Sequence, residues 1–130
     1  MARLIFLWAP PVATMIGMFL VSSQHQVPVP LPGRTDLLAH LTAYGGLTLL
    51  LVRACAGGRW AGVTTRALTA AWVVAAAWGV SDEIHQMFVP GRSAGPDDWL
   101  ADATGAALAV IVSRAAARGI ARRRAARDAV

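Results

Sequence analysis

Residues 67–89 read ALTAAWVVAAAWGVSDEIHQMFV, an apolar run that carries no charge before Asp82 and ends in a cluster of polar residues. At about 1.5 Å per residue, a helix over this stretch is long enough to cross about 30 Å of hydrocarbon. Its middle lacks the polar stripe that a helix on the surface of a soluble bundle shows. The stretch therefore predicts a transmembrane helix with chemically active side chains near its C-terminal end.

Three further apolar runs lie outside this stretch, at Leu4–Ser23, Leu37–Ala54 and Trp99–Ser113. The chain has 130 residues, 56% hydrophobic and 15% charged, and its mean hydropathy is +0.52. A soluble domain of this length would carry more charged residues than this chain, and a disordered chain would have fewer apolar residues. Cys55 is the only cysteine, so an intrachain disulfide is excluded. We predict an all-α integral membrane protein with four transmembrane helices in residues 1–113, followed by an arginine-rich cytoplasmic tail at 114–130.

The arginines are distributed unevenly about the four predicted helices. All 12 basic residues are arginines, and only Arg34 and Arg92 lie in the two loops on one side. The positive-inside rule then places both termini and the Gly57-Gly58 loop in the cytoplasm. We predict a plasma-membrane protein whose loops at 24–36 and 90–98 face outward. The basic tail is interpreted as a topology signal that contacts anionic lipid, not as a nucleic-acid arm.

The first apolar run has two unusual features. Pro10 and Pro11 lie inside it and are expected to kink the helix, which membrane spans tolerate. Arg3 before the run and residues 21–23 at its end also resemble the flanks of a signal peptide. Cleavage of this segment stays open at this point, and it would not change the sidedness of the other helices.

The two outer loops read alike. The first contains His25-Gln26, Pro32-Gly33-Arg34 and Asp36-Leu37-Leu38-Ala39-His40, and the second His85-Gln86, Pro90-Gly91-Arg92 and Asp98-Trp99-Leu100-Ala101-Asp102. Corresponding residues are 58 to 62 positions apart. Our hypothesis is a duplication into two parallel helix–loop–helix repeats, related by an axis along the membrane normal.

Polar residues near the outer ends of the helices fall on shared faces. Asp36, His40 and Tyr44 are four residues apart, and so are Asp98 and Asp102. Ionisable groups at membrane depth are costly and usually pair or line a wet cavity. We therefore predict one outward-facing substrate-binding site formed by Asp36, His40, Tyr44, Asp82, His85, Gln86, Arg92, Asp98 and Asp102.

The remaining residues near this site are assigned structural roles. Glu83 and Asp97 are interpreted as groups that hold helix ends and solvate loops. Gly105 continues the face of Asp98 and Asp102, and is expected to let another helix pack closely.

The residue types of the site suggest its chemistry. An arginine beside a proline–glycine turn, as at Arg92, suits bidentate binding of a phosphate or carboxylate. His85 is a candidate general acid or base, with Asp82 or Asp98 orienting it. No tight metal-ligand motif is present, so we predict neither a metal nor a cofactor.

The block DEIHQMFVPGR at residues 82–92, followed by DWLADATG at 98–105, resembles the VanZ-like family, and so does the spacing of Asp36, His40 and Tyr44. The resemblance implies a small multi-span membrane protein, and the founding member is associated with low-level teicoplanin resistance. It implies no settled biochemical activity. The chain departs from the family pattern at three positions. Family members frequently have lysine at the position of Leu37, usually have asparagine at the position of Asp102, and have glycine at the position of Ala109.

Three functions are compatible with these residues. The preferred hypothesis is a cell-envelope protein whose outer site binds a lipid headgroup or a lipid-linked cell-wall precursor, with a link to glycopeptide resistance. The alternative is a membrane enzyme that acts on a phosphate-containing lipid with His85 as general acid or base. A proton-coupled transporter is third, because the spans are apolar toward the midplane. The expected partners are membrane lipids and an envelope precursor, and no nucleic acid is expected. The sequence does not decide the oligomeric state.

Overall fold

Four α-helices and one short 3-10 helix make up the described part of the chain. The computed structural model describes residues 1–24, 33–92 and 95–129, with only the backbone described for residues 33–36. The helices are α1 (Ala2–Ser22), α2 (Gly33–Cys55), α3 (Thr65–Gln86) and α4 (Pro96–Asp128), and η1 (Trp60–Gly62) lies between α2 and α3. The described ranges contain no strand. The predicted all-α architecture with four helices is confirmed.

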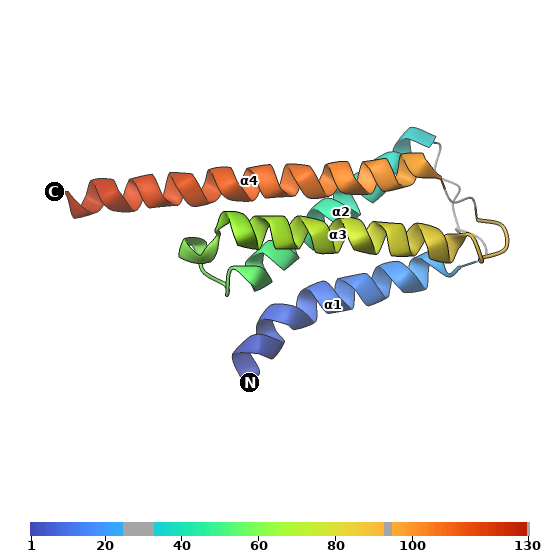
Figure 1. Ribbon diagram of the computed structural model, residues 1–130, viewed down its shortest axis with the longest axis horizontal. Coiled ribbons are helices and arrows are strands. Elements are labelled where there is room, and N and C mark those ends of the chain that lie inside the picture. Colours follow the sequence, from blue (N-terminus) through green and yellow to red (C-terminus); the bar gives the residue numbers. More distant parts are fainter. Residues whose placement is uncertain (25–32, 93–94, 130) are drawn as a thin grey trace.

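The helices alternate in direction (Figure 1). α1 and α3 run one way, and α2 and α4 return beside them. α2 is the central element, since it packs against the other three helices and most extensively against α4. The hairpins α1–α2 and α3–α4 therefore have the same orientation, which is what the duplication hypothesis requires.

Three of the helices are long and apolar enough to cross a membrane. They are α1, residues Leu37–Cys55 of α2, and α4. α3 has 22 residues and so the necessary length. It includes Arg66 near its start and Asp82 and Glu83 near its end, which lower its mean hydropathy. α3 is therefore not among the three helices that qualify as spans, and its crossing of the membrane stays a prediction.

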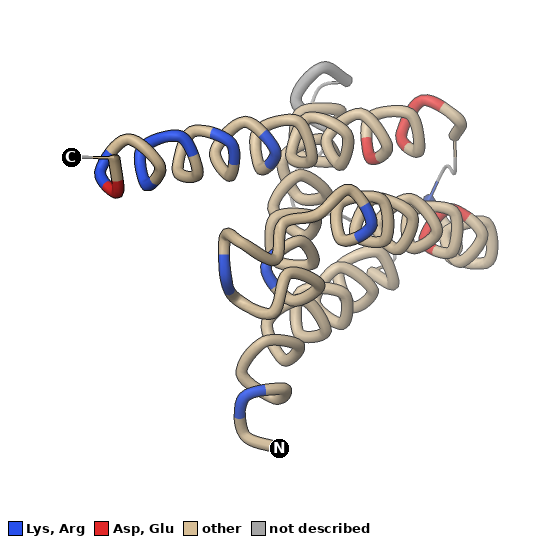
Figure 2. The backbone as a smooth tube through the Cα atoms, turned by 60° about the vertical axis from the view of Figure 1, so that its left-hand side comes forward, with Lys and Arg blue, Asp and Glu red and all other residues tan. Residues whose placement is uncertain are grey.

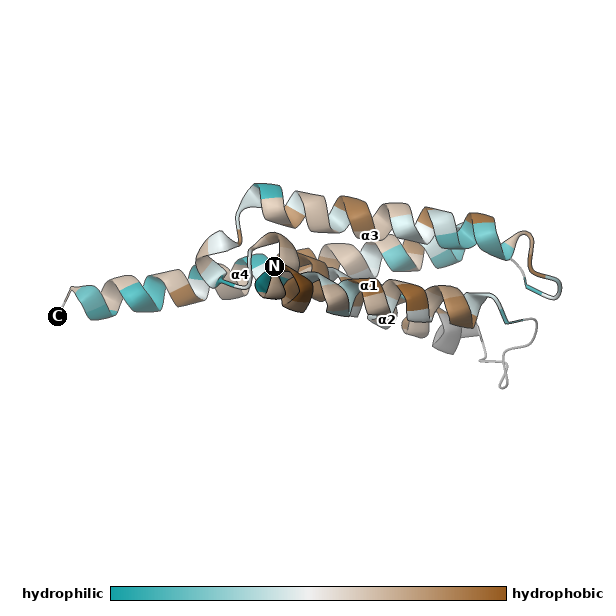
Figure 3. Cartoon of the chain, turned by 90° about the horizontal axis from the view of Figure 1, so that it is seen from below, coloured by the Kyte–Doolittle hydropathy of each residue, from teal (hydrophilic) through white to brown (hydrophobic). Residues whose placement is uncertain are grey.

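The outside of the bundle is covered by large apolar side chains. Phe6 is 68% exposed, Leu38 60% and Ile111 61%. Figure 3 shows hydrophobic residues along the helices and hydrophilic ones toward both ends, in the C-terminal part of α4 and near the end of α3. An apolar exterior of this extent suits contact with hydrocarbon and not with water.

Small residues allow the helices to approach closely at the centre. A Cβ at Gly105 of α4 would overlap the main-chain carbonyl of Leu41 in α2. A Cβ at Gly45 would lie 3.4 Å from the carbonyl oxygen of Gly105 itself. The close packing predicted for Gly105 is confirmed, and its partner is α2. The buried core around this crossing consists of Tyr44, Leu47, Leu51, Val52, Leu68, Ala71, Ala75 and Ala106.

Two tryptophans join α3 to α4. Trp72 Nε1 donates a hydrogen bond to the carbonyl of Ala103 at 3.4 Å, and Trp99 Nε1 donates to the carbonyl of Ala76 at 3.4 Å. One bond runs from α3 to α4 and the other runs back. Both side chains are therefore held against a neighbouring helix.

An arginine compensates for a proline in α1. Pro10 has no N–H to donate to the carbonyl of Phe6, four residues earlier. Arg53 of α2 donates to this carbonyl through Nη1 at 3.4 Å, and its guanidinium lies 4.6 Å from the centre of the Phe6 ring. Figure 1 shows α1 changing direction in its first half, where the prolines lie. The expected kink is therefore present and is held by α2.

α4 is too long to lie entirely within a bilayer. Its 33 residues span about 50 Å, and its C-terminal part extends beyond the other helices (Figure 1). The helix continues through the predicted boundary at residue 113 to Asp128. This boundary therefore marks a change of composition and not the end of a helix. The division into domain and tail stays a prediction.

Charges of opposite sign separate toward opposite ends of the bundle (Figure 2). We call the end with the termini and η1 the basic end, because it carries Arg3, Arg53, Arg59, Arg66 and the arginines of the α4 tail. We call the end where α3 finishes and α4 begins the acidic end. It carries Asp82, Glu83, Asp97, Asp98 and Asp102.

Candidate functional site

A cavity of about 370 Å³ lies at the acidic end, between α1, α2 and α3. Five of the predicted site residues line it, namely His40, Tyr44, Asp82, Gln86 and Arg92. The facing wall comes from α1 and includes Gly17, Met18 and Val21. The cavity thus has one polar wall and one apolar wall, which suits a ligand that has both a polar group and an apolar part.

Asp82 and Gln86 form one part of the polar wall. They lie one turn apart on α3, and Gln86 Nε2 donates a hydrogen bond to Asp82 Oδ2 at 3.1 Å. Asp82 is 7% exposed and Gln86 2%. The second carboxylate oxygen, Asp82 Oδ1, is buried and has no hydrogen-bond partner in the described structure. This oxygen can accept a hydrogen bond from a ligand.

Tyr44 extends the polar wall toward the middle of the bundle. Its side chain is 1% exposed, and its hydroxyl is buried without a partner among the described residues. Tyr44 lies one turn beyond His40 on α2, and both side chains line the same cavity. The spacing of these two residues in the sequence therefore predicted their shared face correctly.

A tight turn fixes Arg92. The backbone N–H of Arg92 donates to the carbonyl of Val89 at 3.2 Å across Pro90 and Gly91. Gly91 has a φ of 81°, which with proline before it corresponds to a type II turn. The turn returns the chain over the end of the bundle, and Arg92 lines the cavity with a buried Nε that has no described partner. The proline–glycine–arginine motif thus supplies a preorganised cation.

Asp102 lies behind the cavity and not in its wall. It is completely buried, and its Oδ1 is 2.9 Å from His40 Nδ1. Gly79 of α3 leaves room for it, since a Cβ at that position would come within 3.0 Å of Asp102 Oδ2. Asp102 therefore orients His40, which in turn lines the cavity.

His85 faces α1, and it is absent from the cavity wall. Its Nε2 is 2.9 Å from Ser23 Oγ, and the Phe19 ring lies 4.4 Å from its own ring. The Ser23 hydroxyl donates to the Phe19 carbonyl at 2.6 Å, so its single proton is engaged and His85 Nε2 is the donor between them. Asp82 bonds to Gln86 and not to His85. The catalytic pair that we considered, His85 oriented by Asp82, is therefore not formed in this structure.

The other polar residues of the acidic end lie outside the cavity. Glu83 Oε2 accepts a hydrogen bond from the backbone N–H of Gly95 at 2.9 Å, which closes the loop onto α3. Asp98 is half-buried in the first turn of α4. The side chains of Asp36 and Arg34, and all of His25, lie outside the described residues.

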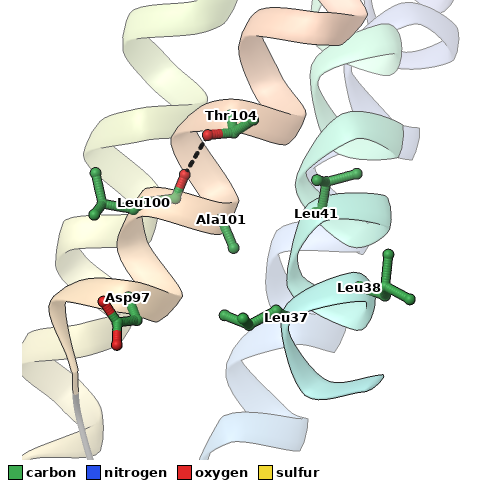
Figure 4. A pocket seen from close by; sticks show the side chains of 7 residues that line it. All are labelled: Leu37, Leu38, Leu41, Asp97, Leu100, Ala101 and Thr104. Carbon is green, nitrogen blue, oxygen red and sulfur yellow. Dashed lines mark hydrogen bonds between the residues drawn. The ribbon is translucent and has the colours of Figure 1, made fainter. Parts of the chain in front are cut away.

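A second hollow, of about 500 Å³, lies between α2 and α4 (Figure 4). Among the described side chains, its walls are mainly leucines, and Asp97 is the only charged residue that lines it. Thr104 in this hollow donates its hydroxyl to the Leu100 carbonyl of its own helix at 2.7 Å. The hollow therefore has little to offer a polar ligand, and the cavity with Arg92 is the candidate site.

Within the described ranges, no group of three or more histidine, cysteine or acidic side chains is placed to hold a metal ion.

The sequence analysis did not identify Gly79, Ser23 or the α1 wall as parts of the site. Gly79 had a signal, since a glycine one turn before Asp82 on the same helix can make room for a neighbouring helix, whereas the α1 wall has mainly apolar residues and no motif to identify it.

A comparison with protein families identifies the chain. The VanZ/LLP1 family model matches residues 10–117. The chain belongs to the VanZ/LLP1 family. The matched region covers α2 and α3 completely and contains every residue of the cavity wall. No match was found among curated proteins or among solved structures.

Proposed function

We propose that this VanZ/LLP1 protein binds a lipid headgroup or a lipid-linked cell-wall precursor in the cavity at its acidic end. The observation that carries the proposal is a set of buried atoms on residues lining the cavity that have no hydrogen-bond partner among the described residues: Asp82 Oδ1, Arg92 Nε and the Tyr44 hydroxyl. Buried polar atoms normally have hydrogen-bond partners, and a ligand would supply them.

The cavity suggests how a ligand would be arranged. Arg92 would bind a phosphate or carboxylate, because a guanidinium makes charge-assisted bonds to such groups. Asp82 Oδ1 would accept a hydrogen bond from an amine, amide or hydroxyl on the same headgroup. The apolar wall from α1, with Met18 and Val21, would lie along the start of a hydrocarbon chain.

The proposal includes an orientation in the plasma membrane. Arginines concentrate at the basic end, which the positive-inside rule assigns to the cytoplasm. The cavity then opens toward the outer leaflet, where glycopeptides meet precursors of the cell wall. Binding or sequestration of such a precursor would connect the protein with the teicoplanin resistance that is associated with the family.

Two observations favour binding over the alternatives. For an enzyme with His85 as general base, the imidazole would have to reach the ligand, but it is bonded to Ser23 and packed on Phe19. For a proton-coupled transporter, titratable groups would continue toward the basic end. The core beyond Tyr44 consists instead of apolar residues such as Leu47, Leu51 and Ala71, which do not titrate.

Lipid binding to purified protein tests the proposal. Native mass spectrometry with a polyprenyl diphosphate and with phosphatidylethanolamine would measure binding to the wild type, Arg92→Gln and Asp82→Asn. Loss of one charge-assisted bond should weaken binding of the preferred lipid about tenfold. Arg92→Lys should restore only part of it, because a point charge does not replace a bidentate fork.

Asp97→Asn is the matched control, since it removes an acid of the same end that does not line the cavity. Folded protein would be quantified for each variant by its melting temperature. Unchanged lipid binding in both Arg92→Gln and Asp82→Asn, with folding intact, would rule out the cavity as the binding site.

A further inference from the structure

We propose a second ligand site at the opposite, basic end, which binds the phosphate of an anionic phospholipid. A cavity of about 300 Å³ lies there between the C-terminal part of α2, the turn that leads into η1, and α4. The cavity at the acidic end, called the outer cavity below, shares no lining residue with this one. The two sites are therefore independent of each other.

All charged groups of this second cavity have the same sign. Arg53 and Arg59 line it, and no acidic residue does so in the part of the chain that the structure describes. Trp60 and Ser113 add an indole N–H and a hydroxyl. In the outer cavity, by contrast, Asp82 accompanies Arg92. A cavity that offers cations and hydrogen-bond donors without a carboxylate is selective for an anion.

The arginines differ in what they can offer a ligand. Arg53 is already tied to α1 through the Phe6 carbonyl and ring. Arg59 is exposed, and it follows Gly57 and Gly58, whose φ angles of 63° and 71° turn the chain at the end of α2. The exposed Arg59 side chain is thus available to bind a phosphate, and Arg53 adds its positive charge to the site.

The remaining walls identify the anion as part of a lipid. Leu49 and Val52 of α2 line the cavity on the side toward the middle of the bundle. Trp60 is 48% exposed at the end of the apolar region, the position where tryptophan prefers the headgroup layer. Free phosphate would use only the donors, whereas a phospholipid would also place its first methylene groups against the leucine and valine. Basic cavities of this kind on the cytoplasmic side suit anionic headgroups.

Full-length protein in nanodiscs of phosphatidylcholine with or without phosphatidylglycerol tests the site. Retained lipid, measured by native mass spectrometry, should include phosphatidylglycerol, and its apparent affinity should fall about tenfold in Arg59→Gln. Arg66→Gln at the start of α3 is the matched control, because it removes the same charge from an exposed position at the same end that does not line the cavity. Ser113→Ala provides a second variant inside the cavity, with a smaller expected loss of about twofold to fivefold.

Each other outcome contradicts the proposal in a defined way. If inorganic phosphate stabilises the protein in pure phosphatidylcholine as much as phosphatidylglycerol does, the site binds free phosphate and the lipid assignment is wrong. If Arg59→Gln and Arg66→Gln weaken binding equally, only the overall charge matters and there is no site. Loss of the outer-cavity function leaves this measurement unaffected, so the two proposals can fail separately.

Discussion

His40 Nδ1 lies 2.9 Å from Asp102 Oδ1, and this contact joins α2 to α4 between residues that are 62 positions apart. In the alignment of the two outer loops, His40 and Asp102 occupy equivalent places after Asp36 and Asp98. Two identical residues at this contact, both histidine or both aspartate, would repel when charged. The two halves have instead a donor in one and an acceptor in the other.

Removal of His40 should destabilise the bundle. His40→Ala leaves the completely buried Asp102 without this hydrogen-bond donor, which should cost about 1–3 kcal/mol in the free energy of unfolding in detergent. Asp102→Asn should cost less, because its amide oxygen still accepts from His40 Nδ1. An unchanged free energy of unfolding in His40→Ala would mean that the contact has no energetic role.

Exchange of the two residues provides a stronger test of the same contact. The double variant His40→Asp with Asp102→His keeps the pair in reversed order, and it should be more stable than either single exchange. The coupling energy from this double-mutant cycle isolates the pair from other effects of each substitution. Strict additivity would contradict the equivalence of the two positions.

Gly105→Ala should separate α2 from α4. The added Cβ would overlap the Leu41 carbonyl, and overpacking of this kind costs about 1–3 kcal/mol. Gly46→Ala is the control in α2, where a Cβ meets nothing within 4 Å. It should be neutral or stabilising, since alanine favours helix more than glycine does. Thermal melting of both variants in the same detergent decides between them.

Arg53 should stabilise the kinked start of α1. Arg53→Gln removes the donor to the Phe6 carbonyl and the contact with the Phe6 ring, at an expected cost of about 1 kcal/mol. Arg66→Gln removes an exposed arginine from the same end and is the control for net charge. Proteolysis near the N-terminus should increase only in Arg53→Gln, and equal increases would remove the special role of Arg53.

The membrane orientation can be measured with single cysteines in a Cys55→Ala background. Asp97→Cys at the acidic end should react with an impermeant thiol reagent added to intact cells. Ala61→Cys at the basic end should react only after the membrane is opened. Both positions are exposed in the structure, so access from the two sides of the membrane is the only difference tested. The reverse pattern would overturn the orientation.

The sequence by itself determined the four helices, the sign of the charge at each end and the residues that carry the family motif. These properties are local or additive. Apolar runs of sufficient length form helices in hydrocarbon because every backbone group must be paired there, and arginines far apart in the chain contribute independently to sidedness. The turn before Arg92 was likewise predicted from its proline and glycine, and the positive φ of Gly91 in the structure gives it the type II conformation.

Only the tertiary structure decided which of the polar residues share a cavity. The i, i+3 spacing that suggested a pairing of Asp82 with His85 puts both on one side of α3. A rotation of about 60° separates them around the helix axis, so Asp82 meets the cavity while His85 meets Ser23 of α1. Which neighbour each side chain meets depends on where Gly105 and Gly79 let the helices cross, and that is a property of four packed surfaces and not of any one segment.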